Sequence, residues 1–207
     1  MKEIILKNPV CAILRGVDPE KVVPYAKAVY AGGVKMFEVA MNSEGAAGQI
    51  EALRQEFGES AWVGAGTVIN EERCLQAKAA GAQFFLTPSA TVSTLEFCRE
   101  HKIPLLPGVM TPTDVAVCLA YGYSTMKLFP AGDLPMGYIK SLKGPYDGTE
   151  YVAVGGVSPK NIRQFFEAGF IGVGIGSSLA PKDLVQAGRW DEVTEYIISM
   201  MKEVKPS

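Results

Sequence analysis

Lys127 is the residue whose surroundings in the sequence point most directly to chemistry. It lies within residues 125–131, an apolar run typical of a strand buried on both faces. A buried cation is costly unless it is paired, or unless it is neutral and used. A lysine amine with a lowered pKa forms Schiff bases with carbonyl substrates. The alternatives are a lysine at a strand end that reaches water, or one half of a structural salt bridge.

Eight strand–helix units are expected to position this lysine. Short apolar, β-branched runs alternate with helix-periodic stretches, which predicts a parallel sheet covered by helices. The predicted strands are residues 10–14, 36–40, 62–66, 84–87, 104–107, 125–129, 152–154 and 172–175. The predicted helices are residues 20–31, 43–57, from 70, from 91, after 111, 136–142, 158–168 (with Pro159 as first helical residue) and 182–202. The pattern predicts a single-domain (β/α)8 TIM barrel of the α/β class over residues 1–207.

Glu38 is the candidate partner of Lys127. Several predicted helices end in glycine, which suits the left-handed residue that terminates a helix, at Gly33, Gly81, Gly122 and Gly169. The fifth residue after each of these is Glu38, Leu86, Lys127 and Gly174. Alternate strands of a barrel supply one layer of inward side chains, so Glu38 and Lys127 are expected to face the interior together. This assumes equal loops, because a slip of one residue would turn a side chain outward.

A carboxylate and an amine in one apolar cavity can act as an acid/base group and a nucleophile. The structural alternative for Glu38 and Lys127 is a buried salt bridge, which is a poor way to stabilise a core. Polar groups near the carboxyl ends of barrel strands are typical of catalysis, because the following loops build the site there.

Other polar residues follow other predicted strands. Arg15 could clamp a carboxylate or phosphate in bidentate fashion, or form a salt bridge at the rim. Asn42 fits a substrate contact or a helix cap, with Ser43 the favoured cap. Thr67 offers a hydroxyl after a glycine-rich strand. The side chain of Phe129 is expected on the same face of the strand as that of Lys127, where it would line a pocket or belong to the core.

Two glycine loops predict a phosphate site. The seventh strand ends in Gly155-Gly156-Val157-Ser158, and the eighth in Gly174-Ile175-Gly176-Ser177-Ser178. Barrels often bind phosphate with backbone N–H groups of these two loops. Glycine also occurs in tight turns, so either loop alone is weak evidence for a phosphate site, but the two loops together favour a phosphorylated substrate.

Composition argues against several classes of protein. A formal net charge of −2 and a pI of about 5.6 give no electrostatic reason to expect nucleic acid or an anionic membrane as partner. The N-terminus is too short and charged for a signal peptide, and no apolar run approaches the roughly 18 residues of a membrane span. The four cysteines form no C-x-x-C pair and are expected to be reduced, in a cytoplasmic protein. With one histidine, His101, a histidine- or thiolate-rich metal site is not expected.

Six segments of the chain share a family pattern, in order and at matching intervals over nearly its whole length. They are Phe37-Glu38-Val39, Gly64-Ala65-Gly66-Thr67-Val68, Thr87-Pro88-Ser89, Pro107-Gly108-Val109, Met126-Lys127-Leu128-Phe129-Pro130-Ala131 and Val154-Gly155-Gly156-Val157-Ser158-Pro159. The lysine segment and the glutamate are the specific part, whereas the glycine loops are generic. Together they resemble the 2-dehydro-3-deoxy-phosphogluconate / 4-hydroxy-2-oxoglutarate aldolases.

The resemblance implies a class I aldolase, a homotrimer of small barrels without metal or cofactor. It implies cleavage of a 2-keto-3-deoxy-6-phospho sugar acid to pyruvate and glyceraldehyde 3-phosphate, with 4-hydroxy-2-oxoglutarate, cleaved to pyruvate and glyoxylate, as a further substrate. By analogy Lys127 forms the Schiff base and Glu38 moves protons, partly through water. The pyruvate end would be lined by Thr67, Pro88 and Phe129, and the phosphate end by Gly155, Gly156 and Ser177.

One position departs from the gluconate-type pattern. Those enzymes usually carry Thr-Leu-Arg-Thr after the glutamate, with the arginine near the substrate carboxylate, whereas this chain has Ala40-Met41-Asn42-Ser43. The arginine is thus missing at Asn42, and Arg15 is the candidate to replace its charge. Arg15-Gly16 and Asn42-Ser43 look more like the galactonate-type branch, so the configuration at C4 of the substrate stays open.

Two rival interpretations fit the same barrel. An isomerase or epimerase acting on phosphorylated sugars would need a metal or a pair of acid/base groups, and it would be insensitive to borohydride with pyruvate. A non-catalytic barrel that senses sugar phosphates would bind and saturate without turnover. The Glu38–Lys127 pair argues against the second, because a sensor has no use for a strained amine.

Overall fold

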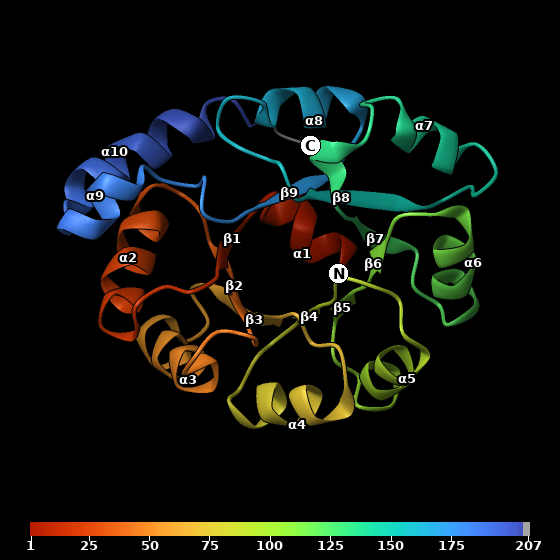
Figure 1. Ribbon diagram of the computed structural model, residues 1–207, viewed down its shortest axis with the longest axis horizontal. Helices are drawn as coiled ribbons and strands as arrows, with labels where there is room; N and C mark the ends of the chain where they lie inside the picture. The colour runs from red at the N-terminus through yellow and green to blue at the C-terminus, as the bar shows by residue number, and fades with distance from the viewer. Residues whose placement is uncertain (205–207) are drawn as a thin grey trace.

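The computed structural model describes residues 1–204, a ring of parallel strands surrounded by helices (Figure 1). The strands are β1 (Val10–Leu14), β2 (Met36–Ala40), β3 (Trp62–Gly66), β4 (Phe85–Leu86), β5 (Leu105–Leu106), β6 (Gly108–Val109), β7 (Thr125–Leu128), β8 (Glu150–Val154) and β9 (Gly172–Ile175). Their order is β5-β4-β3-β2-β1-β9-β8-β7-β6. β5 and β6 are separated only by Pro107, so the two ends of this order meet. Among residues 1–204, the nine strands therefore occupy the eight strand positions of a (β/α)8 barrel, as predicted, with β5 and β6 sharing the fifth position.

Pro107 divides the fifth barrel strand into β5 and β6, because proline has no N–H to donate to a neighbouring strand. Its carbonyl still accepts a hydrogen bond from Lys127 N at 2.8 Å, and the carbonyl of Leu106 accepts one from Thr87 N at 3.4 Å. The fifth barrel strand is therefore hydrogen-bonded to its neighbours on both sides, and the barrel is closed at this point.

The helices begin where the sequence supplies caps. Asp18 accepts a hydrogen bond from Glu20 N at 3.0 Å, Asn70 accepts one from Arg73 N at 3.0 Å, and Thr111 forms a capping box with Asp114. The helices are α1 (Lys2–Lys7), α2 (Pro19–Ala31), α3 (Ala46–Phe57), α4 (Glu71–Ala79), α5 (Val92–Glu100), α6 (Pro112–Ala120), the 3-10 helix η1 (Ala131–Asp133), α7 (Tyr138–Lys143), α8 (Ile162–Ala168), α9 (Lys182–Ala187) and α10 (Trp190–Met201). Within residues 1–204, none of these helices has the length and apolar character needed to span a membrane.

Three helix predictions differ from the structure by more than two residues or by an interruption. α3 begins at Ala46 instead of residue 43, because Gly45 before it takes the left-handed conformation, with φ 68°. α8 begins at Ile162, so Pro159 lies in a turn before the helix. The last predicted helix is interrupted at Gly188, whose φ of 68° ends α9 before α10 begins.

Strand side chains alternate between two layers of the core. One layer packs between strands and outer helices and includes Ala12, Phe37 and Ala153. The other fills the barrel interior and consists of Ile5, Cys11, Met36, Phe84, Leu86, Leu106, Val152 and Val154, with Ile13, Trp62 and Phe129 among its partly buried neighbours. Leu86 faces inward as the glycine spacing predicted. So does the position of Gly174, where a Cβ would lie 3.0 Å from both Ile13 and Val154.

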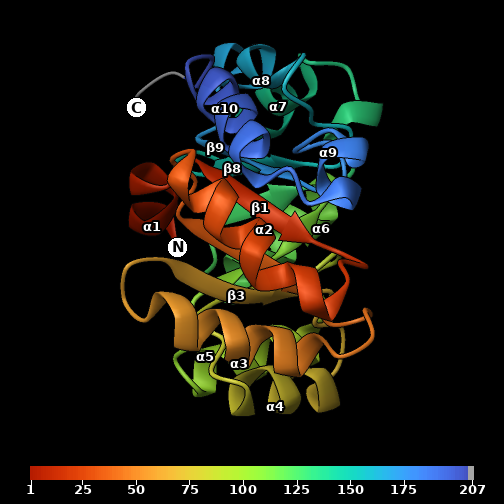
Figure 2. The same ribbon diagram turned by 90° about the vertical axis from the view of Figure 1, so that its left-hand side faces the viewer.

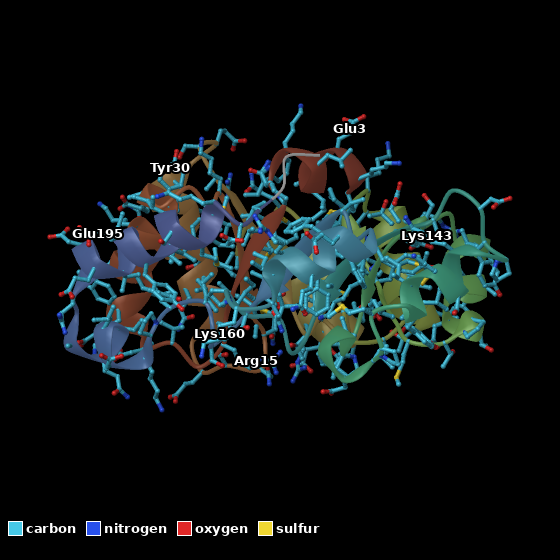
Figure 3. All side chains as sticks on the ribbon, turned by 90° about the horizontal axis from the view of Figure 1, so that it is seen from above. Glu3, Arg15, Tyr30, Lys143, Lys160 and Glu195 are labelled. Atoms are coloured by element: carbon cyan, nitrogen blue, oxygen red, sulfur yellow. The ribbon has the colours of Figure 1, made fainter. Side chains whose placement is uncertain are left out.

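α1, which was not predicted from the sequence, covers one end of the barrel (Figure 2). Ile5 on this helix belongs to the interior layer and approaches Gly172 so closely that a Cβ there would lie 2.6 Å from its side chain. Lys2 of α1 donates to Glu150 of β8 at 3.1 Å and ties the helix to this strand, and Lys143 of α7 donates to the same carboxylate at 2.9 Å. Figure 3 shows Glu3 of α1 and Arg15, which follows β1, at opposite ends of the molecule, so the mouth of the barrel lies away from α1.

Replacing Ile5 by alanine should destabilise the protein by about 2–4 kcal/mol, because the side chain is 1% exposed and its loss leaves a cavity in the barrel interior. The free energy of unfolding in urea measures the effect. Leu6→Ala on the same helix is the matched control, since Leu6 is 37% exposed and should change stability by about 0.5 kcal/mol or less. Equal losses in the two variants would contradict the role given to Ile5.

Candidate active site

Lys127 on β7 is buried inside the barrel near its mouth. Its side chain is only 5% exposed, and Nζ lies 4.8 Å from the centre of the Phe129 ring. Among residues 1–204, no ion pair within 4.0 Å involves this amine. Burial lowers the pKa of Lys127, the charge of Glu38 partly offsets that shift, and the charge of Arg15 adds to it. The lysine therefore neither reaches bulk water nor forms a direct salt bridge, so both structural alternatives fail.

Glu38 on β2 is the carboxyl group of the same interior. It is 1% exposed, and its Oε2 is buried without a hydrogen-bond partner among residues 1–204. Burial raises the pKa of Glu38, while the charges of Lys127 and Arg15 offset part of the shift. The pKa of the acid and the pKa of the amine thus move toward each other, which suits a pair that exchanges protons with a bound substrate.

Gly66 at the end of β3 makes room for this carboxyl group. A Cβ on Gly66 would lie 1.4 Å from Glu38 Oε1, closer than any two unbonded atoms can approach. The glycine at this strand end therefore makes room for a side chain. The adjacent Gly64 has a similar role, because a Cβ there would lie 2.5 Å from the ring of Phe84.

Arg15 extends from the end of β1 at the mouth. It is exposed, and its guanidinium influences the pKa of both Glu38 and Lys127. Its Nη2 lies 3.4 Å from Thr67 Oγ1, a long hydrogen bond. Thr67 itself has a φ of 57°, which is uncommon for a residue with a side chain, and its carbonyl accepts a hydrogen bond from Arg73 at 3.0 Å. Arg73 was not singled out from the sequence.

A cavity of about 450 Å³, here called the mouth cavity, lies between the ends of β1, β7, β8 and β9. Five of the predicted site residues line it: Arg15, Phe129, Gly155, Gly156 and Ser177. The other residues along it are Ile13, Val154, Val157, Ser158, Gly174, Gly176 and Ser178. The two glycine loops therefore meet on one wall, as their positions after β8 and β9 predicted.

The Gly155-Gly156 loop is held by its neighbours on both sides. Gly155 and Gly156 have φ of 87° and 72°, and a Cβ on Gly156 would lie 2.8 Å from Gly132 Cα. Gly132 N donates a hydrogen bond to Gly155 O at 2.8 Å. Asn161 donates to Gly156 O at 2.9 Å and accepts from Ser158 N at 2.8 Å. Neither residue was predicted from the sequence: only the fold brings Gly132 to this loop, whereas Asn161 is close to it in sequence.

Five predicted site residues do not line the mouth cavity: the buried pair Lys127 and Glu38, and three others. Asn42 is exposed beyond the end of β2. Thr67 connects to the cavity only through Arg15. Pro88 packs against β6, where a Cβ on Gly108 would lie 2.4 Å from its carbonyl carbon. Ser43, which follows Asn42, does not cap α3. Its hydroxyl instead accepts a hydrogen bond from Gly16 N at 3.0 Å, which connects the loop after β1 to the loop after β2.

The cysteines and acidic residues add no metal-binding group. Within residues 1–204, no cluster of three or more histidine, cysteine, aspartate or glutamate side chains is placed to hold an ion. Cys11 faces the interior beside the pair, and burial, with a contribution from Glu38, raises the pKa of its thiol. Cys11 is therefore a neutral neighbour of Lys127.

Comparison with known proteins places the chain among aldolases. The sequence profile described as KDPG and KHG aldolase matches residues 1–196. The KHG/KDPG aldolase of Escherichia coli (strain K12) is 36% identical over 197 residues, which cover 94% of this chain and 91% of that protein. The 2-dehydro-3-deoxy-6-phosphogalactonate aldolase of the same strain is 34% identical over 190 residues, 91% of this chain and 90% of that one.

A solved structure gives the same result for the fold. The KDPG aldolase of Legionella pneumophila, crystallised with pyruvate captured as a covalent carbinolamine intermediate, superposes with a TM-score of 0.86. It is 29% identical, and the match covers 96% of this chain and 97% of that one. The likeness thus extends over nearly the whole of both chains.

Replacing Glu38 by glutamine should lower the pKa of Lys127 further, because the carboxylate charge is what raises it against the effect of burial. The pH dependence of Lys127 modification by an amine reagent, followed by peptide mass spectrometry, measures this pKa. Glu44→Gln is the matched control, since Glu44 is exposed on the loop after the same strand. A midpoint that is unchanged or higher in Glu38→Gln would show that the two groups do not interact.

Proposed function

This chain belongs to the KDPG and KHG aldolase family, and on that basis we propose that Lys127 is its Schiff-base nucleophile and Glu38 its proton carrier. The observation that carries the proposal is the state of Lys127: buried, without an ion pair within 4.0 Å among residues 1–204, and with its pKa lowered. Such an amine is neutral in a larger fraction of molecules than a surface lysine, and the neutral form is the one that attacks a carbonyl.

The reaction begins with attack of the neutral Lys127 amine on the C2 ketone of the substrate. The resulting carbinolamine loses water and becomes an iminium ion. Glu38, ionised, accepts the proton of the C4 hydroxyl, directly or through one water. The C3–C4 bond then breaks, its electron pair moves into the iminium, and an aldehyde leaves. The enamine takes up a proton at C3, and hydrolysis of the new iminium releases pyruvate and restores the amine.

The covalent carbinolamine of pyruvate in the Legionella pneumophila enzyme supports this route. In this chain the apolar surroundings of Lys127, with the Phe129 ring 4.8 Å away, suit the methyl and methylene carbons of the keto acid. We assign Phe129, Thr67 and Pro88 to the pyruvate end. Thr67 acts there through its contact with Arg15. Pro88 acts through its packing against β6, the strand that pairs with β7 beside Lys127.

Arg15 is assigned to the substrate carboxylate, with Asn42 at the rim beside it. A planar guanidinium binds a carboxylate with two parallel hydrogen bonds, and the position after Met41 offers an amide instead of a second cation. The remaining polar wall of the mouth cavity is formed by Gly155, Gly156 and Ser177. Backbone N–H groups and a hydroxyl suit the phosphate of the leaving aldehyde.

The substrate we propose is a 2-keto-3-deoxy-6-phospho sugar acid of the gluconate or galactonate type, cleaved to pyruvate and glyceraldehyde 3-phosphate. Cleavage of 4-hydroxy-2-oxoglutarate to pyruvate and glyoxylate is a second activity. Relatives of about equal identity carry the gluconate and galactonate names. Pyruvate release from the three substrates, compared side by side, decides among them.

We further propose that residues 1–207 act as one barrel domain, cytoplasmic and assembled into a homotrimer. Exposed large apolar side chains, among them Ile69, Val92, Met110 and Met136, offer surface that other copies of the chain could cover. Sedimentation equilibrium tests this, and the mass of a single chain would contradict it.

Borohydride reduction in the presence of pyruvate should add one pyruvate-derived mass to the peptide that contains Lys127. Lys127→Ala should lose both the label and turnover. Glu38→Gln is the informative companion variant: it should still be labelled, while kcat falls by about 10²–10⁴-fold through loss of the proton carrier. A label on another lysine, or none on the wild-type protein, would refute the assignment, and wild-type turnover in Glu38→Gln would remove Glu38 from the mechanism.

Asn161→Ala should raise KM for the phosphorylated substrate by about tenfold, the effect of roughly 1.4 kcal/mol from two lost hydrogen bonds to the backbone of the Gly156 loop. The KM for 4-hydroxy-2-oxoglutarate should stay unchanged, because that substrate has no phosphate. Gln164→Ala on the exposed face of α8 is the matched control. A parallel rise of KM for both substrates would mean that Asn161 supports the fold and not the phosphate loop.

A further inference from the structure

A second cavity lies beside the mouth cavity, between the loop after β1, α2 and α9. This side cavity has a volume of about 540 Å³, within the range of about 300–1,000 Å³ typical of small-molecule sites. Val17, Lys21, Tyr25, Lys182 and Val185 line it and do not line the mouth cavity. The proposed reaction uses none of these five residues.

The side cavity shares one wall with the mouth cavity. Ile13, Arg15, Gly176 and Ser177 line both. Arg15 is the charged member of this wall, and it is exposed at the mouth, as Figure 3 shows. Its guanidinium is therefore available to a ligand in either cavity.

The charge along the side cavity is unbalanced. Arg15, Lys21 and Lys182 contribute three cations, against the single carboxylate of Asp18. Asp18 already accepts the capping hydrogen bond from Glu20 N at 3.0 Å, and Lys21 donates to the neutral carbonyl of Gln186 at 3.0 Å. In the described part of the chain, none of the three cations forms an ion pair. A concave surface with two excess positive charges attracts a dianion.

The remaining wall is apolar. Val17 and Val185 line it, together with Tyr25, whose ring centre lies 6.3 Å from that of Trp190. Burial raises the pKa of Tyr25 to about 12, so its hydroxyl stays neutral at physiological pH. A ligand that fills this space therefore has a carbon body next to its charged group.

We propose that the side cavity binds a small organic dianion, of the phosphate monoester or dicarboxylate class, that is distinct from the substrate of the aldol reaction. Lys21 and Lys182 hold the charged group, and Tyr25 with the valines contacts the carbon body. A bound dianion also attracts Arg15 and withdraws it from the mouth cavity, so occupancy weakens substrate binding. This inhibition rests on the proposed function, because it requires Arg15 to contact the substrate; the binding itself does not.

Phenyl phosphate is the probe for binding, since it joins a dianion to an apolar ring. Its titration is followed by the fluorescence of Trp190 in a Trp62→Phe background, which leaves Trp190 as the one tryptophan. We expect saturable binding, weakened at least about tenfold in Lys21→Gln/Lys182→Gln. Lys160→Gln is the matched control, because Lys160 is exposed at the same end of the molecule and lines neither cavity (Figure 3). Binding that is absent in the parent, unchanged in the double variant, or lost equally in Lys160→Gln overturns the proposal.

Kinetics with 4-hydroxy-2-oxoglutarate test the inhibition, because this substrate has no phosphate to compete with the probe at the glycine loops. Phenyl phosphate should raise its KM in the wild-type protein and leave it unchanged in Lys21→Gln/Lys182→Gln. Without the probe, KM for this and for the phosphorylated substrates should be the same in both proteins. A higher KM in the double variant without the probe would mean that substrate itself occupies the side cavity, and the proposal would fail. Absence of turnover with every substrate would instead refute the proposed function, and the titration would still decide the binding.

Discussion

The whole arrangement at the mouth of this barrel depends on holding an amine and a carboxyl group in one apolar interior without joining them. Lys127 and Glu38 are 5% and 1% exposed, yet no ion pair within 4.0 Å links them among residues 1–204. Burial therefore opposes the charged form of each group, and their mutual attraction offsets only part of that effect. A direct salt bridge would have favoured the charged form of both groups.

The space for this pair comes from residues that have no side chain. Gly66 leaves room for the Glu38 carboxyl, and Gly132 with Gly156 lets two loops approach until their backbones touch. Each is a place where a single added carbon would collide with a neighbour. The interior is closed at the other end by Ile5 of α1, so the apolar surroundings of Lys127 are maintained by a helix that contributes nothing to the mouth. Reactivity at one end thus depends on packing at the other.

Arg15 connects the chemistry to the surface. It is close enough to shift the pKa of Glu38 and of Lys127, it touches Thr67, and it lines both cavities. A flexible, exposed cation with several possible anionic partners can be redistributed among them at low cost, since no ion pair in the described chain holds it. The inhibition proposed above relies on this freedom of Arg15 to exchange one anionic partner for another.

The sequence by itself determined the barrel and the inward facing of Lys127 and Glu38, because strand and helix periodicity and the glycines before strands are local signals that repeat along the chain. It also placed both glycine loops on one wall, since the ends of neighbouring parallel strands lie together. Only the tertiary structure decided that the pair is close without an ion pair among residues 1–204, that Gly132 packs against the Gly155-Gly156 loop, and that Asn42 lies outside the mouth cavity. Those facts depend on the distances between segments remote in sequence, which are set by packing and have no local signature.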